Sequence, residues 1–185
     1  MARLRETLYC FTMLVENHTL RSDPQPPPLS DPSLNDKVAF LSRGDAYQPP
    51  VAAVTRRETH MSFVFLAGDR AYKLKKPVRF PYLDFSTLAR REAACRAELS
   101  LNRRLAPDIY RGVVPLARSG RDELAIGGGG ETVDWLVVMN RLDESQMLDR
   151  AIEEGRLQRW QLDRLAAVLV QFYRRAGAAF VAPQA

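Results

Sequence analysis

Residues 57–80, with the sequence RETHMSFVFLAGDRAYKLKKPVRF, decide the fold of this chain. The segment Ser62–Ala67 is apolar and rich in aromatic and β-branched residues, which favours a strand. Gly68-Asp69 is a favoured two-residue connection, because glycine adopts a positive φ without a clash at Cβ. The return strand is expected over Arg70–Lys76, and Pro77 ends it because proline has no N–H to pair. The stretch therefore predicts a β-hairpin.

Two lysines are expected on the inward face of this hairpin. Side chains alternate along a strand, so Lys73 and Lys75 share one face. With a two-residue turn, Lys73 lies opposite Val64, among apolar neighbours. A buried ammonium group is costly without an anionic partner. The hairpin therefore predicts a carboxylate or a bound anion close to these lysines.

The sequence after the hairpin predicts a long helix over residues 87–105, capped by Ser86. Glu98 falls inside the apolar arc of this helix, and a core-facing carboxylate needs a cation. Residues three and four positions from Glu98 are not cationic, so we expect an ion pair between strand and helix. Lys73 is the first choice, while Lys75, Arg91 and solvation of the carboxylate stay open. The arc is defined by Leu88, Cys95, Leu99, Leu101 and Leu105.

The remaining elements suggest a mixed architecture. Strands are expected over residues 51–58, from Val113, and as an antiparallel pair over 124–126 and 133–139. The four glycines between the last two strands precede neither Lys-Ser/Thr nor a helix, so they predict a hairpin tip rather than a phosphate loop. Helices are expected near residues 37–41, before Gly155, and over 158–175. This order predicts an α+β fold with a small antiparallel sheet and one long packed helix.

The composition narrows the functional classes. The net charge of +5 comes from dispersed arginines, without a helix-turn-helix, zinc-finger or RNP pattern, so nucleic-acid binding is the least favoured hypothesis. Cys10 and Cys95 are far apart and indicate neither a disulfide framework nor a zinc site. No apolar run is long enough to span a membrane, and residues 8–15 lack a following cleavage site. We therefore expect a cytoplasmic protein.

Several stretches resemble bacterial proteins with an aminoglycoside-phosphotransferase-like domain, which has the protein-kinase-like fold and is often fused to a P-loop ATPase domain. The similar stretches, in the same order, are Glu58–Ser62, Tyr72–Val78, Phe80–Leu88 and Glu98–Pro107. Ala71-Tyr72-Lys73 also resembles the Ala-x-Lys of the third kinase strand. The resemblance runs from about residue 34 to residue 175.

Composition and this resemblance together predict three parts. By their composition, residues 1–33 are expected to form a disordered or weakly helical extension with a proline-rich linker. Residues 34–142 correspond to the kinase-like N-lobe and hinge. Residues 143–185 correspond to the helical start of a truncated C-lobe. The chain is then the amino-terminal part of a phosphotransferase domain.

The resemblance also implies a site for ATP and Mg²⁺. Lys73 would hold the phosphates and Glu98 would orient it, with Lys75 beside them. The turn over residues 59–62 would replace a glycine-rich loop, and residues 139–142 would offer backbone hydrogen bonds to adenine. The nucleotide-binding residues expected on this basis are Thr59, His60, Ser62, Lys73, Lys75, Glu98, Met139 and Arg141.

The catalytic half of the family pattern is missing. Phosphoryl transfer needs a catalytic-loop Asp, an Asn and a metal-binding Asp. The only histidines are His18 and His60, and neither His-x-Asp nor Asp-Phe-Gly occurs. We therefore expect an incomplete nucleotide site, inactive alone and without metal ligands, and the phosphoryl acceptor stays open. The alternative is a non-catalytic nucleotide-binding or protein-interaction module.

The last expected helix carries an apolar stripe of Leu162, Leu165, Leu169 and Phe172. Without helical partners this stripe would be partly uncovered. Such a surface favours self-association or docking of a C-terminal half.

Overall fold

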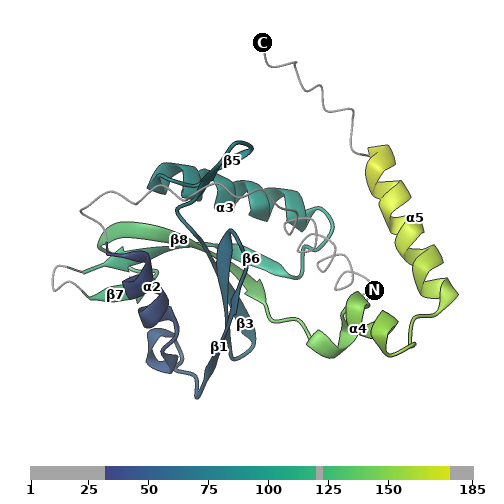
Figure 1. The fold of residues 1–185 in the computed structure, drawn as a ribbon, viewed down its shortest axis with the longest axis horizontal. Coiled ribbons are helices and arrows are strands. Elements are labelled where there is room, and N and C mark those ends of the chain that lie inside the picture. The colour runs from purple at the N-terminus through teal and green to yellow at the C-terminus, as the bar shows by residue number, and fades with distance from the viewer. Residues whose placement is uncertain (1–31, 120–122, 176–185) are drawn as a thin grey trace, which may run out of the picture. The chain divides into compact units, whose positions relative to one another are not determined.

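The structure is a computed structural model that describes residues 32–119 and 123–175 (Figure 1). These residues fall into two compact units, 32–142 and 143–175. The extension and linker expected over residues 1–33 lie outside the described residues, except for their last two positions. The tail after Gly177 also lies outside them.

The larger unit is built on one antiparallel sheet (Figure 1). The order of its strands is β1-β2-β3-β8-β6-β7. Its strands are β1 (Val54–Glu58), β2 (Ser62–Ala67), β3 (Arg70–Lys75), β6 (Tyr110–Arg118), β7 (Leu124–Ile126) and β8 (Glu131–Asn140). A separate two-stranded ribbon is formed by β4 (Arg79–Phe80) and β5 (Leu83–Asp84).

Helices complete an α+β architecture, as predicted. They are α2 (Leu34–Leu41), α3 (Leu88–Arg103), α4 (Leu148–Glu153) and α5 (Arg159–Arg175), with 3-10 turns at Gly44–Ala46 and Glu144–Gln146. Helix α2 packs with Phe65, Leu74 and Leu136 on one face of the sheet, where the apolar core lies. Helix α3 lies against β8 and β6, and its Glu98 meets β3 on the face opposite this core. Glu98 and its β3 partner therefore lie on the other side of the sheet from the apolar core.

The hairpin expected over residues 62–76 is confirmed. Strands β2 and β3 are joined by the two residues Gly68 and Asp69, and Gly68 has a φ of 59°. Val64 pairs with Lys73 as predicted. The return strand ends at Lys75, one residue earlier than expected, and β1 begins at Val54 rather than Val51. The register follows directly from the short turn.

The expected pairing of residues 124–126 with 133–139 is wrong. Strand β8 lies between β3 and β6, so both of its edges are already occupied. Strand β7 instead pairs with β6, with Leu116 opposite Ile126. The central position of Trp135–Met139 is confirmed, because β8 pairs on both sides. Strand β7 therefore extends the sheet from the preceding strand β6 instead of from the following strand β8.

The N-cap of α3 also differs from the prediction by one residue. The Thr87 side chain accepts a hydrogen bond from the Arg90 amide, so Thr87 caps the helix. The Ser86 hydroxyl donates to Asp84 instead, at 2.6 Å. Hydrogen bonds from Ser86, assisted by Arg90, lower the pKa of Asp84 to about 2. Ser86 therefore belongs to the β5 connection rather than to the helix.

Candidate functional site

Two lysines of β3 meet one carboxylate of α3. Lys73 Nζ lies 3.2 Å from Glu98 Oε1, and Lys75 Nζ lies 2.6 Å from Glu98 Oε2. Both lysines are buried, at 3% and 4% exposure. The strand–helix ion pair predicted from the sequence is confirmed, and both candidate lysines take part in it. We call this group the lysine–glutamate clamp (Lys73, Lys75 and Glu98).

The charge state of the clamp follows from its surroundings. Burial by itself raises the pKa of Glu98, but the nearby charges of Lys73 and Lys75 outweigh burial and hold that pKa below its ordinary value. Glu98 is therefore ionised at neutral pH. Lys75 Nζ also lies 4.9 Å from the centre of the Phe85 ring, at cation–π distance.

Ser62 adds a buried hydroxyl to the same face of the sheet. It pairs with Lys75 across β2 and β3, so their side chains share one face. The residue is 1% exposed, and its Oγ has no hydrogen-bond partner among the described residues. Buried polar atoms are normally satisfied, so this unpaired hydroxyl beside buried cations needs an explanation.

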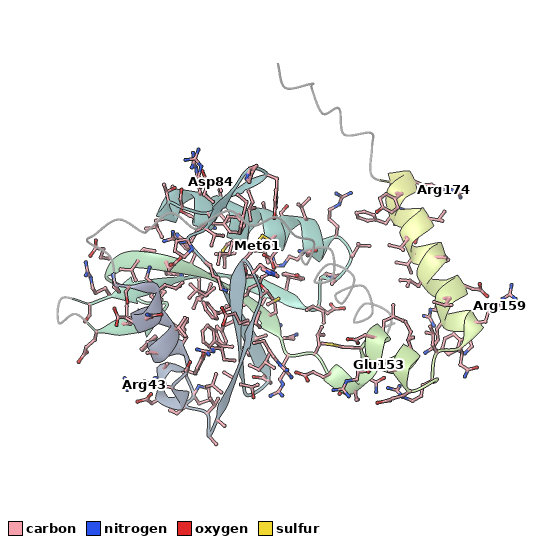
Figure 2. All side chains as sticks on the ribbon, viewed as in Figure 1. Arg43, Met61, Asp84, Glu153, Arg159 and Arg174 are labelled. Atoms are coloured by element: carbon pink, nitrogen blue, oxygen red, sulfur yellow. The ribbon has the colours of Figure 1, made fainter. Side chains whose placement is uncertain are left out.

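The turn between β1 and β2 uses only part of its hydrogen-bonding capacity. The Thr59 amide donates to Ser62 O at 2.9 Å, and the Ser62 amide donates to Thr59 Oγ1 at 3.0 Å. Neither the His60 nor the Met61 amide donates to any described residue. The His60 side chain is exposed, and Figure 2 shows Met61 at the end of this hairpin. Thr59 and Ser62 therefore stabilise the turn, and the two central amides remain available.

Residues 139–142, which are expected to contact adenine, make several contacts within the protein. Met139 is buried within β8, with Ala71 of β3 and Tyr110 of β6 on either side. The Arg141 amide donates to Asp69 O at 2.8 Å, which ties this segment to the β2–β3 turn. In this conformation the Arg141 amide cannot also donate to a ligand.

A second buried ionic group was missed by sequence reasoning. Asp134 of β8 accepts from Lys37 Nζ of α2 at 2.9 Å and from Arg91 Nε of α3 at 2.8 Å. All three residues are at most 4% exposed. We call this group the aspartate triad (Lys37, Asp134 and Arg91). The only sequence signal was a carboxylate within the apolar strand of Val133 and Trp135.

The aspartate triad also settles which side of α3 faces the sheet. Arg91, considered as an alternative partner of Glu98, pairs with Asp134 instead. Arg91, Cys95 and Glu98 form the sheet-facing stripe, whereas Leu101, expected inside, is 59% exposed. The expected apolar arc was therefore wrong at Leu101, because buried ion pairs rather than leucines orient this helix. Burial raises the pKa of Cys95 to about 12, so its thiol remains protonated.

The described residues do not form a metal centre. They contain no group of three or more His, Cys, Asp or Glu side chains able to hold an ion. Within the same residues, none of the helices has the length and apolarity needed to cross a bilayer.

The apolar side of α5 is partly uncovered in the smaller unit. No described residue of this helix is fully buried. Leu162 is 45% exposed, and the other three members of the predicted stripe are half-buried. Trp160, Val170 and Tyr173 are exposed as well, at 58%, 48% and 69%.

These features define an α+β protein with a buried two-lysine, one-glutamate site between a strand and a helix. The chain is 42% identical over 120 residues to proteins of Mycobacterium bovis and of two strains of Mycobacterium tuberculosis, all named only as uncharacterized proteins. The match covers 65% of this chain but 22% of each relative, so the chain spans a minor part of their length. No protein-family model matches the chain. No solved structure matches it either.

Proposed function

We propose that residues 32–142 bind the phosphate groups of a nucleotide, with ATP as the ligand, through the lysine–glutamate clamp. One observation carries the proposal: two buried ammonium groups share one carboxylate opposite a buried hydroxyl that has no described partner. On this proposal the chain is part of a phosphotransferase-like protein with a kinase-like N-lobe.

The chemistry of the clamp supports phosphate as the ligand. Lysine binds phosphate as a compact positive charge, and a strand lysine paired with a helix glutamate is the arrangement that kinases use for this purpose. Glu98 keeps the ammonium groups in place and remains ionised. The Ser62 hydroxyl would donate to a phosphate oxygen. The amides of His60 and Met61 are further candidate donors, in the manner of an anion-binding turn.

The nucleotide must reach residues that are almost closed to solvent. Lys73 and Lys75 are less than 5% exposed, so an anion reaches them only when the surrounding structure opens locally. Binding should therefore change hydrogen exchange in the elements around the clamp. Adenine recognition would use groups of residues 139–142 other than the Arg141 amide, which already has an acceptor.

The proposed role stops at binding. ATP would bring Mg²⁺, but the described residues offer no cluster of carboxylates to hold the ion. The sequence contains no His-x-Asp or Asp-Phe-Gly element. We therefore propose that this chain alone binds nucleotide without transferring its γ-phosphoryl group. ATP turnover by the purified chain, above that of a Lys73→Met control, would contradict this.

A second candidate function is a protein-interaction module in which the clamp is purely structural. The specific observation in its favour is the exposed apolar side of α5, including Leu162 and Tyr173. This alternative predicts normal folding, concentration-dependent association and no response to nucleotide.

Ligand-dependent thermal stabilisation distinguishes nucleotide binding from the protein-interaction module. A ligand at a hundredfold excess over its Kd stabilises the native state by about 2.7 kcal/mol, which raises Tm by on the order of 5–10 °C. We expect such a shift with ATP for the native chain and not for Lys73→Met. Lys76→Met is the matched control, because Lys76 pairs with Glu58 away from the clamp. An unchanged Tm in the native chain would favour the interaction module.

A further inference from the structure

Arg91 makes three hydrogen bonds at the junction between α3 and the sheet. Its Nε donates to Asp134 Oδ1 at 2.8 Å. Its Nη1 lies 3.2 Å from Phe85 O and 3.3 Å from Ser86 O. One buried guanidinium therefore ties the first half of α3 to β8 and to the chain segment that leads into the helix.

The same junction contains the lysine–glutamate clamp. Arg91 and Glu98 are seven residues apart, which is close to two helical turns and puts them on one face of α3. Phe85, whose carbonyl Arg91 holds, presents its ring to Lys75 Nζ at 4.9 Å. Asp134 lies three residues before Val137, which pairs with Lys73 across β8 and β3. The aspartate triad and the clamp are therefore joined through α3, through Phe85 and through β8.

We propose that Arg91 and Asp134 are positioning residues of the clamp, an inference that rests on the proposed nucleotide function. Their ion pair fixes α3 on β8 and thereby holds Glu98 and the Phe85 ring at Lys75. Neither residue contacts the nucleotide on this proposal. Removal of the Arg91–Asp134 pair lets α3 shift, which lengthens the bonds from Glu98 to the two lysines.

Lys37 has a different part in the same triad. Its Nζ bonds to Asp134 Oδ2 and to Val133 O, at 2.9 and 2.8 Å. It comes from α2, which packs on the apolar face opposite the clamp. Lys37 therefore fastens α2 to β8, while Arg91 fastens α3 to β8. Replacing either cation by a neutral residue therefore removes one positive charge from beside the same buried carboxylate, that of Asp134.

Because Arg91 and Lys37 both pair with Asp134, Arg91→Met and Lys37→Met form a matched pair of variants, to be studied in the full chain. The first readout needs no nucleotide: the carbon-13 NMR titration of the Glu98 carboxyl. The charged or titratable groups around Glu98 are Lys73 and Lys75 of β3 and Cys95 of its own helix, with Asp134 of β8 next to Cys95. Loss of the lysine contacts raises the Glu98 pKa, so Arg91→Met should raise it and Lys37→Met should leave it unchanged.

The second readout is ATP affinity. Arg91→Met should weaken binding by about tenfold, a usual size for coupling between distinct sites, whereas Lys37→Met stays within about twofold. If Arg91→Met does not fold, Arg91→Lys takes its place. That variant keeps a charge at Asp134 but loses the Nη1 contacts with Phe85 O and Ser86 O, so it should produce smaller shifts in the same direction.

The outcomes separate the two proposals. Equal effects of Arg91→Met and Lys37→Met on the Glu98 titration would reduce the triad to a general structural role and overturn the inference. An unchanged Glu98 titration in both variants would overturn it as well. If the native chain binds no ATP, the proposed function fails, yet the Glu98 titration still decides whether Arg91 positions the clamp.

Discussion

Replacing Glu98 by glutamine tests the energetic role of the clamp. The substitution keeps the shape of the side chain but leaves Lys73 and Lys75 without the carboxylate that they share. Breaking a buried ion pair by removing one partner costs about 3–5 kcal/mol, because the remaining charge stays desolvated. The Glu98 side chain is 11% exposed, so solvent screens little of this loss. We expect Glu98→Gln to lose about 3–5 kcal/mol of unfolding free energy at pH 7.

The assay is urea denaturation at several pH values, analysed by linear extrapolation. The folded-state pKa of Glu98 lies below its ordinary value of 4.5, so its stabilisation is fully present above pH 4.5. It is lost as the pH falls through the folded-state pKa. The difference between the native chain and Glu98→Gln should therefore be constant near neutral pH and shrink in acid.

Glu92→Gln is the matched control for this prediction. Glu92 lies on the same helix and pairs with the exposed Arg96 at i, i+4. Such surface pairs contribute about 0.5 kcal/mol or less. A loss of less than about 1 kcal/mol in Glu98→Gln, comparable with that of the control, would refute the reasoning from desolvated charge.

Three further predictions concern other parts of the chain. Burial raises the pKa of Cys95 to about 12, so a thiol reagent at pH 8 should label this residue only when the protein unfolds. Mass spectrometry of a Cys10→Ser variant measures the labelling, and rapid labelling of the native protein would contradict the burial of Cys95. A Cβ at Gly44 would lie 2.0 Å from Val51 O, so Gly44→Ala should lower the unfolding free energy measured in urea by about 1–3 kcal/mol. Gly112→Ala is the control, because a Cβ there would meet open space, and equal losses of unfolding free energy in the two variants would contradict the close approach. If the α5 surface mediates self-association, Leu162→Glu should reduce the oligomer fraction in analytical ultracentrifugation, and an unchanged fraction would exclude that surface.

Local chemistry made the central hairpin predictable. Gly68-Asp69 limits the turn to two residues, and this turn sets the register that brings Val64 opposite Lys73. The cost of a buried charge then predicted a partner for Lys73 on the following helix, and Glu98 was the carboxylate on its inner side. One short turn and the cost of one buried charge are therefore enough to predict this part of the fold.

Long-range partners were beyond the same reasoning. Lys37 and Asp134 are 97 residues apart, and no periodicity relates them. Helix α3 is held to the sheet by the Arg91–Asp134 pair, which the helical pattern of leucines does not reveal, and the pattern therefore places Leu101 on the wrong side of the helix. Strand β7 has a neighbour in sequence on each side, β6 and β8, and nothing local indicates that β3 and β6 occupy both edges of β8. Tertiary competition, rather than local propensity, decided these features.

Nucleotide affinity as a function of phosphate number tests the central claim most directly. Calorimetric titration of the native chain with adenosine, AMP, ADP and ATP should show affinity that rises with the number of phosphates, because the proposed clamp acts on phosphate charge. The increase in binding affinity from adenosine to ATP should disappear in Lys73→Met and persist in Lys76→Met. Equal affinity for adenosine and ATP, no binding, or an increment that survives in Lys73→Met would contradict a phosphate-binding role for the clamp.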